Sequence, residues 1–328
     1  MSTPAARTPA IEVHGLRKSF GATTVLDGIS FTVPRGTVFA LLGPNGAGKT
    51  TTVHILSTLL PADGGTAAVA GFDVGAAADE VRRSIGVTGQ FSAVDRLLTA
   101  SENLALMADL FHLDRPAGRR RTAELLEVFD LTDVKDAIVQ TFSGGTKRRL
   151  DLAMTLVGEP RIIFLDEPTA GLDPRSRRRL WQIVRERVAA GVTVFLTTQY
   201  LEEADQLADR IAVLDGGRII ADGTPAELKA RIPGGRARFR FDDAQALVSA
   251  AAVIEHSSAE PGSLSLDVPT DSDDLAGIRA LLERLDGAGI TPAGLTVQTA
   301  DLDDVFLSLT GHSATGPAET EQQKAAAS

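Results

Sequence analysis

The stretch that decides the fold is Gly43–Thr50, which reads G-P-N-G-A-G-K-T. It follows Thr37–Leu42, an apolar run typical of a strand buried on both faces. The residues after it, Thr50–Leu60, have helical periodicity. A glycine-rich loop between a strand and a helix is the setting in which backbone N–H groups bind phosphate. The stretch therefore predicts a site for a nucleoside triphosphate.

Single residues of this loop suit single parts of a nucleotide. We expect Lys49 to reach the β and γ phosphates, Thr50 to bind Mg²⁺ and Thr51 to donate to the α phosphate. Glycine lets the backbone curl closely around an anion. The cradle is predicted to consist of Gly43, Pro44, Asn45, Gly46, Ala47 and Gly48.

A second stretch, Arg161–Glu167, reads R-I-I-F-L-D-E and places two carboxylates after a buried strand. The end of such a strand lies beside the phosphate loop in open α/β sheets. Asp166 is placed to hold Mg²⁺ through water. Glu167 is placed to polarise an attacking water as general base. The alternative interpretation is a structural turn acid before Pro168.

A third stretch, Ser143–Leu150, reads S-G-G-T-K-R-R-L. Ser143 and Gly145 are predicted to form another helix N-terminus with N–H groups suited to a γ phosphate. The two glycine-rich stretches, in this order and with the acidic strand after them, narrow the class of nucleotide-binding protein much further than either does alone.

Composition limits the remaining possibilities. The chain has 328 residues, 43% of them hydrophobic, enough for one large and one small domain. It has no cysteine, and its five histidines form no ligand-spaced cluster, so a metal cage built from side chains is not expected. No run approaches the ~18 apolar residues that cross a bilayer, so any membrane span must come from another polypeptide.

The order of patterns predicts the domains. Residues 1–10 are expected to be a disordered lead-in, and residues 11–230 the nucleotide-binding domain with a helical insert at about 91–155. Thr99 and Glu102 predict a capping box in that insert. After Pro233-Gly-Gly235, alternating strands and helices predict a small α+β domain at 236–312, and 313–328 is expected to be a disordered tail. Residues 241–328 carry a net charge of −12, which argues against nucleic acid as a partner.

With these motifs in order, residues 11–230 resemble the nucleotide-binding subunit of an ABC transporter. The resemblance implies an α/β P-loop NTPase: an ABC cassette with a RecA-like core, an antiparallel β subdomain and a helical insert, followed here by the α+β domain. It makes Gly43–Thr50 the Walker A loop and Asp166 the end of Walker B. Glu167 becomes the catalytic acidic residue that follows Walker B and acts as the base. The implied cofactors are ATP and Mg²⁺.

The same resemblance gives roles to further residues. Gln90, in V-T-G-Q, matches the Q-loop glutamine, which contacts the Mg²⁺ shell or the attacking water. Ser143-Gly144-Gly145-Thr146 matches the signature, and Ala170–Asp173 the D-loop. Phe20 matches the aromatic that stacks on adenine, although an ordinary core phenylalanine is the alternative. In the family the signature closes on the nucleotide of a second subunit, which implies a head-to-tail homodimer with two ATP molecules.

Two positions depart from the family pattern. The fourth and fifth positions of the signature are Thr146 and Lys147, and the family often has glutamine at the fourth. Gln199 stands where the family usually has histidine. A glutamine amide still donates a hydrogen bond to a γ phosphate, but it cannot become cationic or shuttle a proton. We therefore expect Gln199 to keep the geometric role of this switch residue and to lose any acid–base role.

Two stretches, Thr197–Ile211 and Leu302–Gly311, resemble the daunorubicin/doxorubicin-type drug-resistance ATPases. That resemblance implies a peripheral subunit at the cytoplasmic face of the cell membrane. It would drive efflux of a hydrophobic drug or antibiotic through a separate integral-membrane permease. The alternatives are a soluble ABC ATPase acting on ribosomes or DNA, and an ATPase for polysaccharide or lipid export.

Overall fold

The computed structural model divides the chain into two compact units, one within Met1–Pro225 and one within Ala226–Ser313. The structure describes residues 8–89, 93–230, 235–260, 262–270, 275–298 and 306. The predicted tail and most of the predicted lead-in lie outside these residues. Ala10, which the sequence placed in the lead-in, is buried, and its N–H donates to the carbonyl of Val33 over 2.8 Å.

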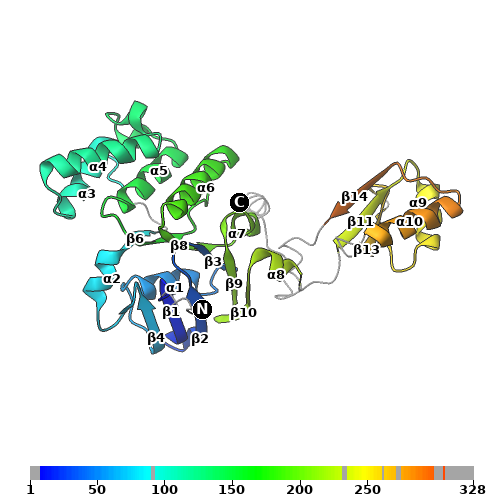
Figure 1. The fold of residues 1–328 in the computed structure, drawn as a ribbon, viewed down its shortest axis with the longest axis horizontal. Helices are drawn as coiled ribbons and strands as arrows, with labels where there is room; N and C mark the ends of the chain where they lie inside the picture. The colour runs from blue at the N-terminus through cyan, green and yellow to red at the C-terminus, as the bar shows by residue number, and fades with distance from the viewer. Residues whose placement is uncertain are drawn as a thin grey trace, which may run out of the picture. The chain divides into compact units, whose positions relative to one another are not determined.

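A six-stranded sheet forms the centre of the first unit, with the strand order β10-β9-β3-β8-β7-β6 (Figure 1). Every neighbouring pair is parallel except β9 and β10, which form an antiparallel hairpin. The bounds are β3 (Val38–Leu42), β6 (Ile85–Thr88), β7 (Ile162–Asp166), β8 (Thr193–Thr198), β9 (Arg210–Asp215) and β10 (Arg218–Gly223). All residues of β3 and β7 are buried, which confirms the predicted buried strands in Thr37–Leu42 and Arg161–Glu167. All residues of β8 are buried as well.

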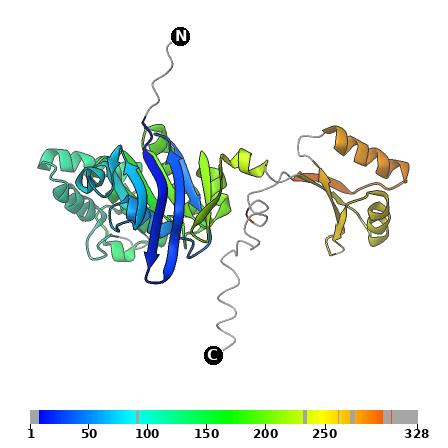
Figure 2. The same cartoon turned by 90° about the horizontal axis from the view of Figure 1, so that it is seen from below.

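A second, antiparallel sheet has the order β2-β1-β4-β5. Its strands are β1 (Ile11–Phe20), β2 (Thr23–Val33), β4 (Gly64–Val69) and β5 (Phe72–Asp73). β1 and β2 form a long ribbon (Figure 2). Asp27-Gly28 is a residue pair typical of turns, but no turn forms here. Both residues lie inside β2, where Gly28 has φ 78° and the pairing with β1 changes register.

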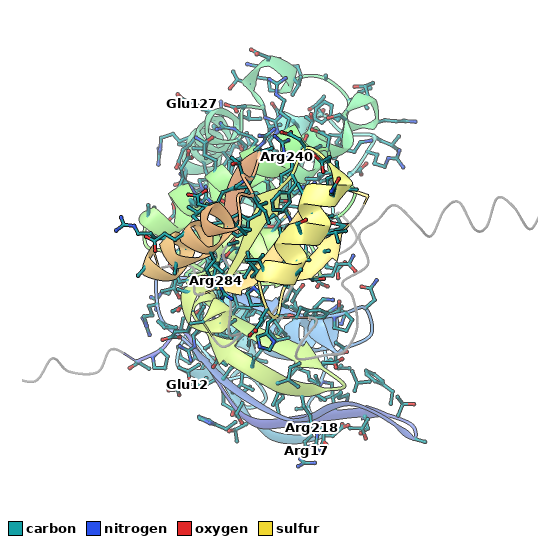
Figure 3. All side chains as sticks on the ribbon, turned by 90° about the vertical axis from the view of Figure 1, so that its right-hand side faces the viewer. Glu12, Arg17, Glu127, Arg218, Arg240 and Arg284 are labelled. Atoms are coloured by element: carbon teal, nitrogen blue, oxygen red, sulfur yellow. The ribbon has the colours of Figure 1, made fainter. Side chains whose placement is uncertain are left out.

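Ion pairs connect the two sheets at their outer ends. Arg17 of β1 and Arg218 of β10 lie side by side in Figure 3, and both pair with Asp27 of β2. Their guanidinium nitrogens lie 2.8 and 2.6 Å from the two carboxylate oxygens of Asp27. Both arginines are exposed, so these pairs orient the sheets more than they stabilise them.

Helices lie around the two sheets, and α3, α4 and α5 lie together on one side (Figure 1). Of these three, α5 also packs against β6. The bounds are α1 (Lys49–Leu56), α2 (Ala78–Ser84), α3 (Ala100–Leu110), α4 (Arg115–Val128), α5 (Gly144–Thr155), α6 (Pro174–Ala189), α7 (Leu201–Leu207) and α8 (Pro225–Lys229). Short 3₁₀ turns, η1 (Thr132–Val134) and η2 (Val139–Thr141), precede α5. The predicted capping box opens α3: Thr99 Oγ1 accepts from Glu102 N–H over 3.1 Å, and a Glu102 carboxylate oxygen accepts from Thr99 N–H over 2.8 Å.

Four aromatic rings form a cluster in the core of the first unit. Phe195 of β8 lies at centroid distances of 5.7, 5.6 and 5.5 Å from Phe31, Phe39 and Phe164. Because Phe31 belongs to β2 and the others to the parallel sheet, this cluster fastens one sheet to the other.

The second unit has a split β-α-β topology. Its elements are β11 (Gly235–Arg240), α9 (Ala244–Val253), β12 (Ser258–Glu260), β13 (Ser265–Thr270), α10 (Leu275–Gly287) and β14 (Gly294–Gln298). The sheet is antiparallel throughout, in the order β12-β13-β11-β14. Ala237, Phe239 and Leu266 pack against apolar residues of α9 and α10, such as Leu247 and Leu285. Within the Leu302–Gly311 stretch, the structure describes only Phe306, which is helical and buried.

The aromatic cluster gives a stability prediction. Phe195→Ala should lower the free energy of unfolding of the first unit by about 3–5 kcal/mol, because the lost ring leaves a cavity between the two sheets. Trp181 is the only tryptophan and is buried in α6, so its fluorescence in a urea titration reports on this unit. Phe72→Ala, at a partly exposed ring, is the control and should cost about 0.5 kcal/mol or less. Equal losses in the two variants would contradict this assignment of the core.

Candidate functional site

The glycine-rich loop connects β3 to α1, and its glycines are required by space as well as by conformation. A Cβ atom at Gly43 would come within 2.2 Å of the Leu214 carbonyl oxygen. A Cβ atom at Gly48, where φ is 108°, would come within 2.6 Å of a Leu26 methyl carbon. At Gly46 a Cβ atom would meet no other atom within 4 Å, but the backbone has φ 82°. Glycine is favoured there by the backbone conformation and not by lack of space. The loop is therefore built to curl tightly before α1 begins at Lys49.

Lys49 connects this loop to the acidic end of β7. Its ammonium donates to the carbonyl oxygens of Gly43 and Pro44 over 2.8 and 3.1 Å, and it lies 3.2 Å from a carboxylate oxygen of Glu167. The side chain is only 4% exposed. Burial lowers the pKa of Lys49, while the charges of Glu167 and Asp166 act in the opposite direction. The structure thus brings the two predicted residues Lys49 and Glu167 into direct contact.

Asp166 and Glu167 follow the expected strand but are held differently. Asp166 is 2% exposed, and one of its carboxylate oxygens accepts a hydrogen bond from the Thr197 hydroxyl. Glu167 has φ 47°, and its N–H donates to the Thr197 carbonyl over 3.1 Å. A non-glycine residue in this region of φ is strained and is held by its surroundings. The alternative of an ordinary turn acid does not explain the contact between Glu167 and Lys49.

The switch segment begins where β8 ends at Thr198, directly before Gln199. β8 lies between β3 and β7 and is parallel to both, so all three strands end at the same edge of the sheet. The Gly43 N–H donates to the Thr198 carbonyl over 3.2 Å, and the Tyr200 N–H to the Thr198 hydroxyl over 2.9 Å. Gln199 is therefore placed at the edge that carries the phosphate loop and Glu167.

The stretch Ser143–Gly145 forms the start of α5, as predicted. The Ser143 hydroxyl accepts from the Thr146 N–H over 3.2 Å and caps the helix. Ser143 and Gly144 are exposed, whereas Gly145 is buried against Ser176 of α6. Among the described residues, the hydrogen bonds and ion pairs do not join Ser143–Gly145 to Gly43–Thr51 of the same chain.

Asp173 caps α6. Its carboxylate accepts from the N–H groups of Arg175 and Ser176 over 3.0 and 2.9 Å, and from the Ser176 hydroxyl over 2.6 Å. The hydrogen bonds from Ser176 lower the pKa of Asp173. Because Ser176 also abuts Gly145, the predicted D-loop acid and the predicted signature lie next to each other.

The structure describes one of the two remaining predicted residues, Phe20. Phe20 ends β1 with its side chain 50% exposed, so the alternative of a core phenylalanine is wrong. The ammonium of Lys18 lies 5.5 Å from the Phe20 ring centroid. Gln90 lies outside the described residues.

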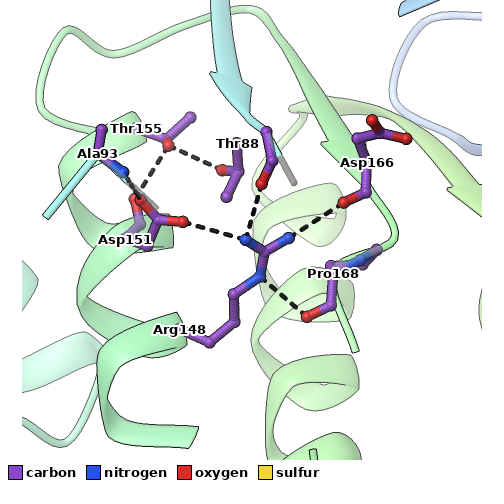
Figure 4. A network of polar contacts seen from close by, with 8 residues as sticks. Thr88, Ala93, Arg148, Asp151, Thr155, Asp166 and Pro168 are labelled. Atoms are coloured by element: carbon purple, nitrogen blue, oxygen red, sulfur yellow. Dashed lines mark hydrogen bonds and ion pairs between the residues drawn. The ribbon is translucent and has the colours of Figure 1, made fainter. Parts of the chain in front are cut away.

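Arg148 of α5 contacts the site, although the sequence analysis quoted it without giving it a role. Its Nε donates to the Pro168 carbonyl over 2.9 Å, one Nη to the Gly89 carbonyl over 3.0 Å, and the other Nη to the Asp166 carbonyl over 3.3 Å (Figure 4). Burial lowers the pKa of Arg148, and the charge of Asp151 opposes this most strongly. Its spacing of three residues from Asp151 was the available signal, since residues at i and i+3 share a helix face.

Glu203 of α7 is a second buried group that the sequence did not point to. It is fully buried and accepts a hydrogen bond from Trp181 Nε1 over 3.1 Å. Burial raises the pKa of Glu203, and the hydrogen bond from Trp181 acts in the opposite direction. Trp181 belongs to α6 and Glu203 to α7, so this hydrogen bond joins the two helices.

The parallel sheet, the glycine loop with its buried lysine, and two acids two strands away define a P-loop nucleoside triphosphatase. The family model described as "ABC transporter" matches residues 26–170. The daunorubicin/doxorubicin resistance ATP-binding protein DrrA of Streptomyces peucetius is 48% identical over 314 residues, 94% of each chain. The doxorubicin resistance ATP-binding protein DrrA of Mycobacterium tuberculosis is 46% identical, covering 92% of this chain and 93% of its own.

A solved structure of an ATP-binding subunit of an ABC transporter superposes with a TM-score of 0.61 at 30% identity, over 68% of this chain and 92% of that one. The chain therefore belongs to the ABC transporter family as an ATP-binding protein, an ATPase whose hydrolysis is coupled to transport. In the part of the chain that the structure describes, no helix is both long and apolar enough to span a bilayer.

Glu203 gives a prediction about pH. A carboxyl whose pKa is raised in the folded state contributes stability below its unfolded pKa of 4.5 and loses it as the pH rises through the folded pKa. Glu203→Gln is neutral at every pH, so its free energy of unfolding relative to wild type should increase from about pH 4 to about pH 8. Urea midpoints across this range measure the difference.

The exposed neighbour Glu202 provides the control for the same chemical change. If Glu203→Gln and Glu202→Gln gave the same pH dependence relative to wild type, burial would not be the cause of the effect.

Proposed function

We propose that the chain hydrolyses MgATP at the edge formed by β3, β8 and β7, as the nucleotide-binding subunit of a two-component exporter. The observation that carries the proposal is the contact between Lys49 and Glu167, which joins the phosphate-binding and the acidic motif at one point. A lysine that is buried against a carboxylate and two carbonyls is held ready to exchange these partners for phosphate oxygens.

The roles within one chain follow from this arrangement. Lys49 binds the β and γ phosphates, Thr51 the α phosphate, and the backbone of Gly43–Gly48 encloses them. Thr50 and Asp166 would hold Mg²⁺, with Gln90 contacting its shell. Hydroxyl and carboxylate oxygens are the donors that Mg²⁺ prefers, so this set fits the ion. When bound, Mg²⁺ would neutralise charge on the phosphate oxygens.

Glu167 acts as the general base toward the attacking water, since its carboxylate is held at the same edge as the phosphate loop. Gln199 supplies an amide donor to the γ phosphate and does not transfer a proton. Phe20 offers one face of a half-exposed ring to adenine.

A second copy of the chain completes each site in this proposal. Ser143 and Gly144 are exposed at the start of α5, which is a place for a γ phosphate brought by a partner. Asp173, beside Gly145, would lie at the same contact. Two chains related head to tail then enclose two ATP molecules.

The proposed partner in the membrane is a separate permease, with this chain bound peripherally at its cytoplasmic side. The cargo that we propose is a hydrophobic drug or antibiotic. Support comes from the names of the relatives, which describe resistance to daunorubicin and doxorubicin, and from the match over nearly the whole of both chains.

Glu167→Gln tests the mechanism and the transport together. The amide keeps the size of the side chain but cannot accept a proton, so turnover should fall by about 10²-fold or more while ATP still binds. Steady-state hydrolysis and equilibrium binding of a fluorescent ATP analogue measure the two effects. The cellular test uses cells that carry the chain with its permease. Cells with Glu167→Gln should accumulate as much doxorubicin as cells with Lys49→Ala, a variant that should not bind ATP.

Near-normal turnover by purified Glu167→Gln protein would remove Glu167 as the base. Unchanged doxorubicin accumulation in both variants, with turnover lost, would instead reject the drug cargo and leave the ATPase mechanism in place.

Gln199→His tests the switch position. If this position supplies only a hydrogen-bond donor, histidine should keep kcat within about threefold of wild type. The pH–rate profile should also keep its shape, because no proton passes through the residue. Gln199→Ala is the control that removes the donor and should lower kcat by about 10-fold or more. A histidine variant as slow as the alanine variant would show that the site depends on the amide itself.

A further inference from the structure

The side chain of Arg148 leaves the helix that bears the signature and ends among backbone carbonyls of the catalytic edge (Figure 4). We propose that Arg148 is a positioning residue that couples the signature end of α5 to the carboxylate of Glu167 in the same chain. The inference rests on the proposed head-to-tail dimer, in which that signature and that carboxylate serve different ATP molecules. Arg148 then connects the two sites.

The first argument is which carbonyls Arg148 binds. Asp166 and Pro168, whose carbonyls accept its N–H groups, are the residues immediately before and after Glu167. The Glu167 N–H is held from the other side by the Thr197 carbonyl. With φ 47°, Glu167 adopts a conformation that only these surroundings maintain. A shift of Arg148 therefore turns the peptide groups that aim the Glu167 carboxylate.

The second argument is the rigidity of the contact. The Arg148 side chain is 13% exposed and that of Asp151, its partner at 3.1 Å, is 4% exposed. Thr155 donates to the Asp151 carbonyl over 3.0 Å, and its hydroxyl lies 2.8 Å from that of Thr88 (Figure 4). A guanidinium fixed in one plane can serve several acceptors at once, which a lysine ammonium on a flexible stem cannot do in the same geometry.

The third argument is the reach of the Arg148–Asp151 pair. Arg148 donates to the Gly89 carbonyl, and Asp151 accepts from the Ala93 N–H over 3.2 Å. Gly89 and Ala93 are the nearest described residues on either side of Gln90. The pair thus holds Gly89 and Ala93 as well as the peptide groups around Glu167.

The last step concerns α5 itself. Ser143 caps the helix and Arg148 stands five residues later, little more than one turn away. A helix of this length moves as a body, so a nucleotide that draws the Ser143 end toward it also moves the Arg148 guanidinium. Engagement of one ATP by the signature would in this way align Glu167 for the other.

The experiment compares Arg148→Lys with Arg149→Lys in the complete complex of this chain and its permease. Arg149 is the matched control, because it is the next residue, is also partly buried, and donates to the Phe129 and Asp130 carbonyls, away from Glu167. Arg148→Lys should lower kcat by about 10- to 100-fold and bring the Hill coefficient for ATP close to one. Equilibrium binding of an ATP analogue should stay within about threefold of wild type, and Arg149→Lys should keep both kcat and cooperativity.

Arg148→Ala with added guanidinium is the second variant, for the case that the lysine variant does not fold. Restoration of kcat by free guanidinium supports a positioning role, and a variant that stays inactive although folded and nucleotide-bound contradicts it. Retention of kcat and cooperativity in Arg148→Lys would overturn the proposal, as would equal losses in the two lysine variants. The proposed function is judged separately, from the turnover of wild type and Glu167→Gln.

Discussion

The ion pair between Lys49 and Glu167 is the constraint on which the rest of the first unit depends. A lysine with 4% exposure needs compensation for its charge, and here one carboxylate and two carbonyls supply it. These partners directly follow β3 and β7, which are separated by β8 in the sheet. Only a parallel order that ends all three strands at one edge brings them together. The aromatic cluster around Phe195 packs the antiparallel sheet against the parallel sheet that carries these strands.

The sequence predicted most accurately the elements whose pattern depends on burial alone. β3 is apolar throughout, and β7 and β8 contain the apolar runs Ile162–Leu165 and Val194–Leu196. Their parallel pairing agrees with burial on both faces. β4, at Gly64–Val69, was not predicted, because its first two residues are glycines and its strand character comes from pairing with β1. The three-residue β12 was missed because a strand that short carries no period and depends on β13.

At the site, sequence reasoning identified residue types but not their contacts. Lys49, Asp166 and Glu167 were predicted from motifs, whereas the hydrogen bond from Thr197 to Asp166 depends on the register of β8 against β7. Arg148 was quoted within a motif, yet its acceptors are backbone carbonyls, which any sequence supplies. Contacts of a side chain with a distant backbone leave no residue-type signal, and this is why the coupling between α5 and Glu167 appears only in three dimensions.

The contact between Gly145 and Ser176 explains why two motifs far apart in sequence act at one place. A Cβ atom at Gly145 would lie 2.3 Å from the Ser176 hydroxyl oxygen, so any larger residue would force α5 away from α6. That hydroxyl in turn donates to Asp173, which caps α6. Glycine at this position therefore serves helix packing within the chain, apart from the role toward phosphate that we propose for this stretch. The Ser176 hydroxyl thus contacts both Gly145 and Asp173, so the surface that we propose for a second copy is formed by contacts within one chain.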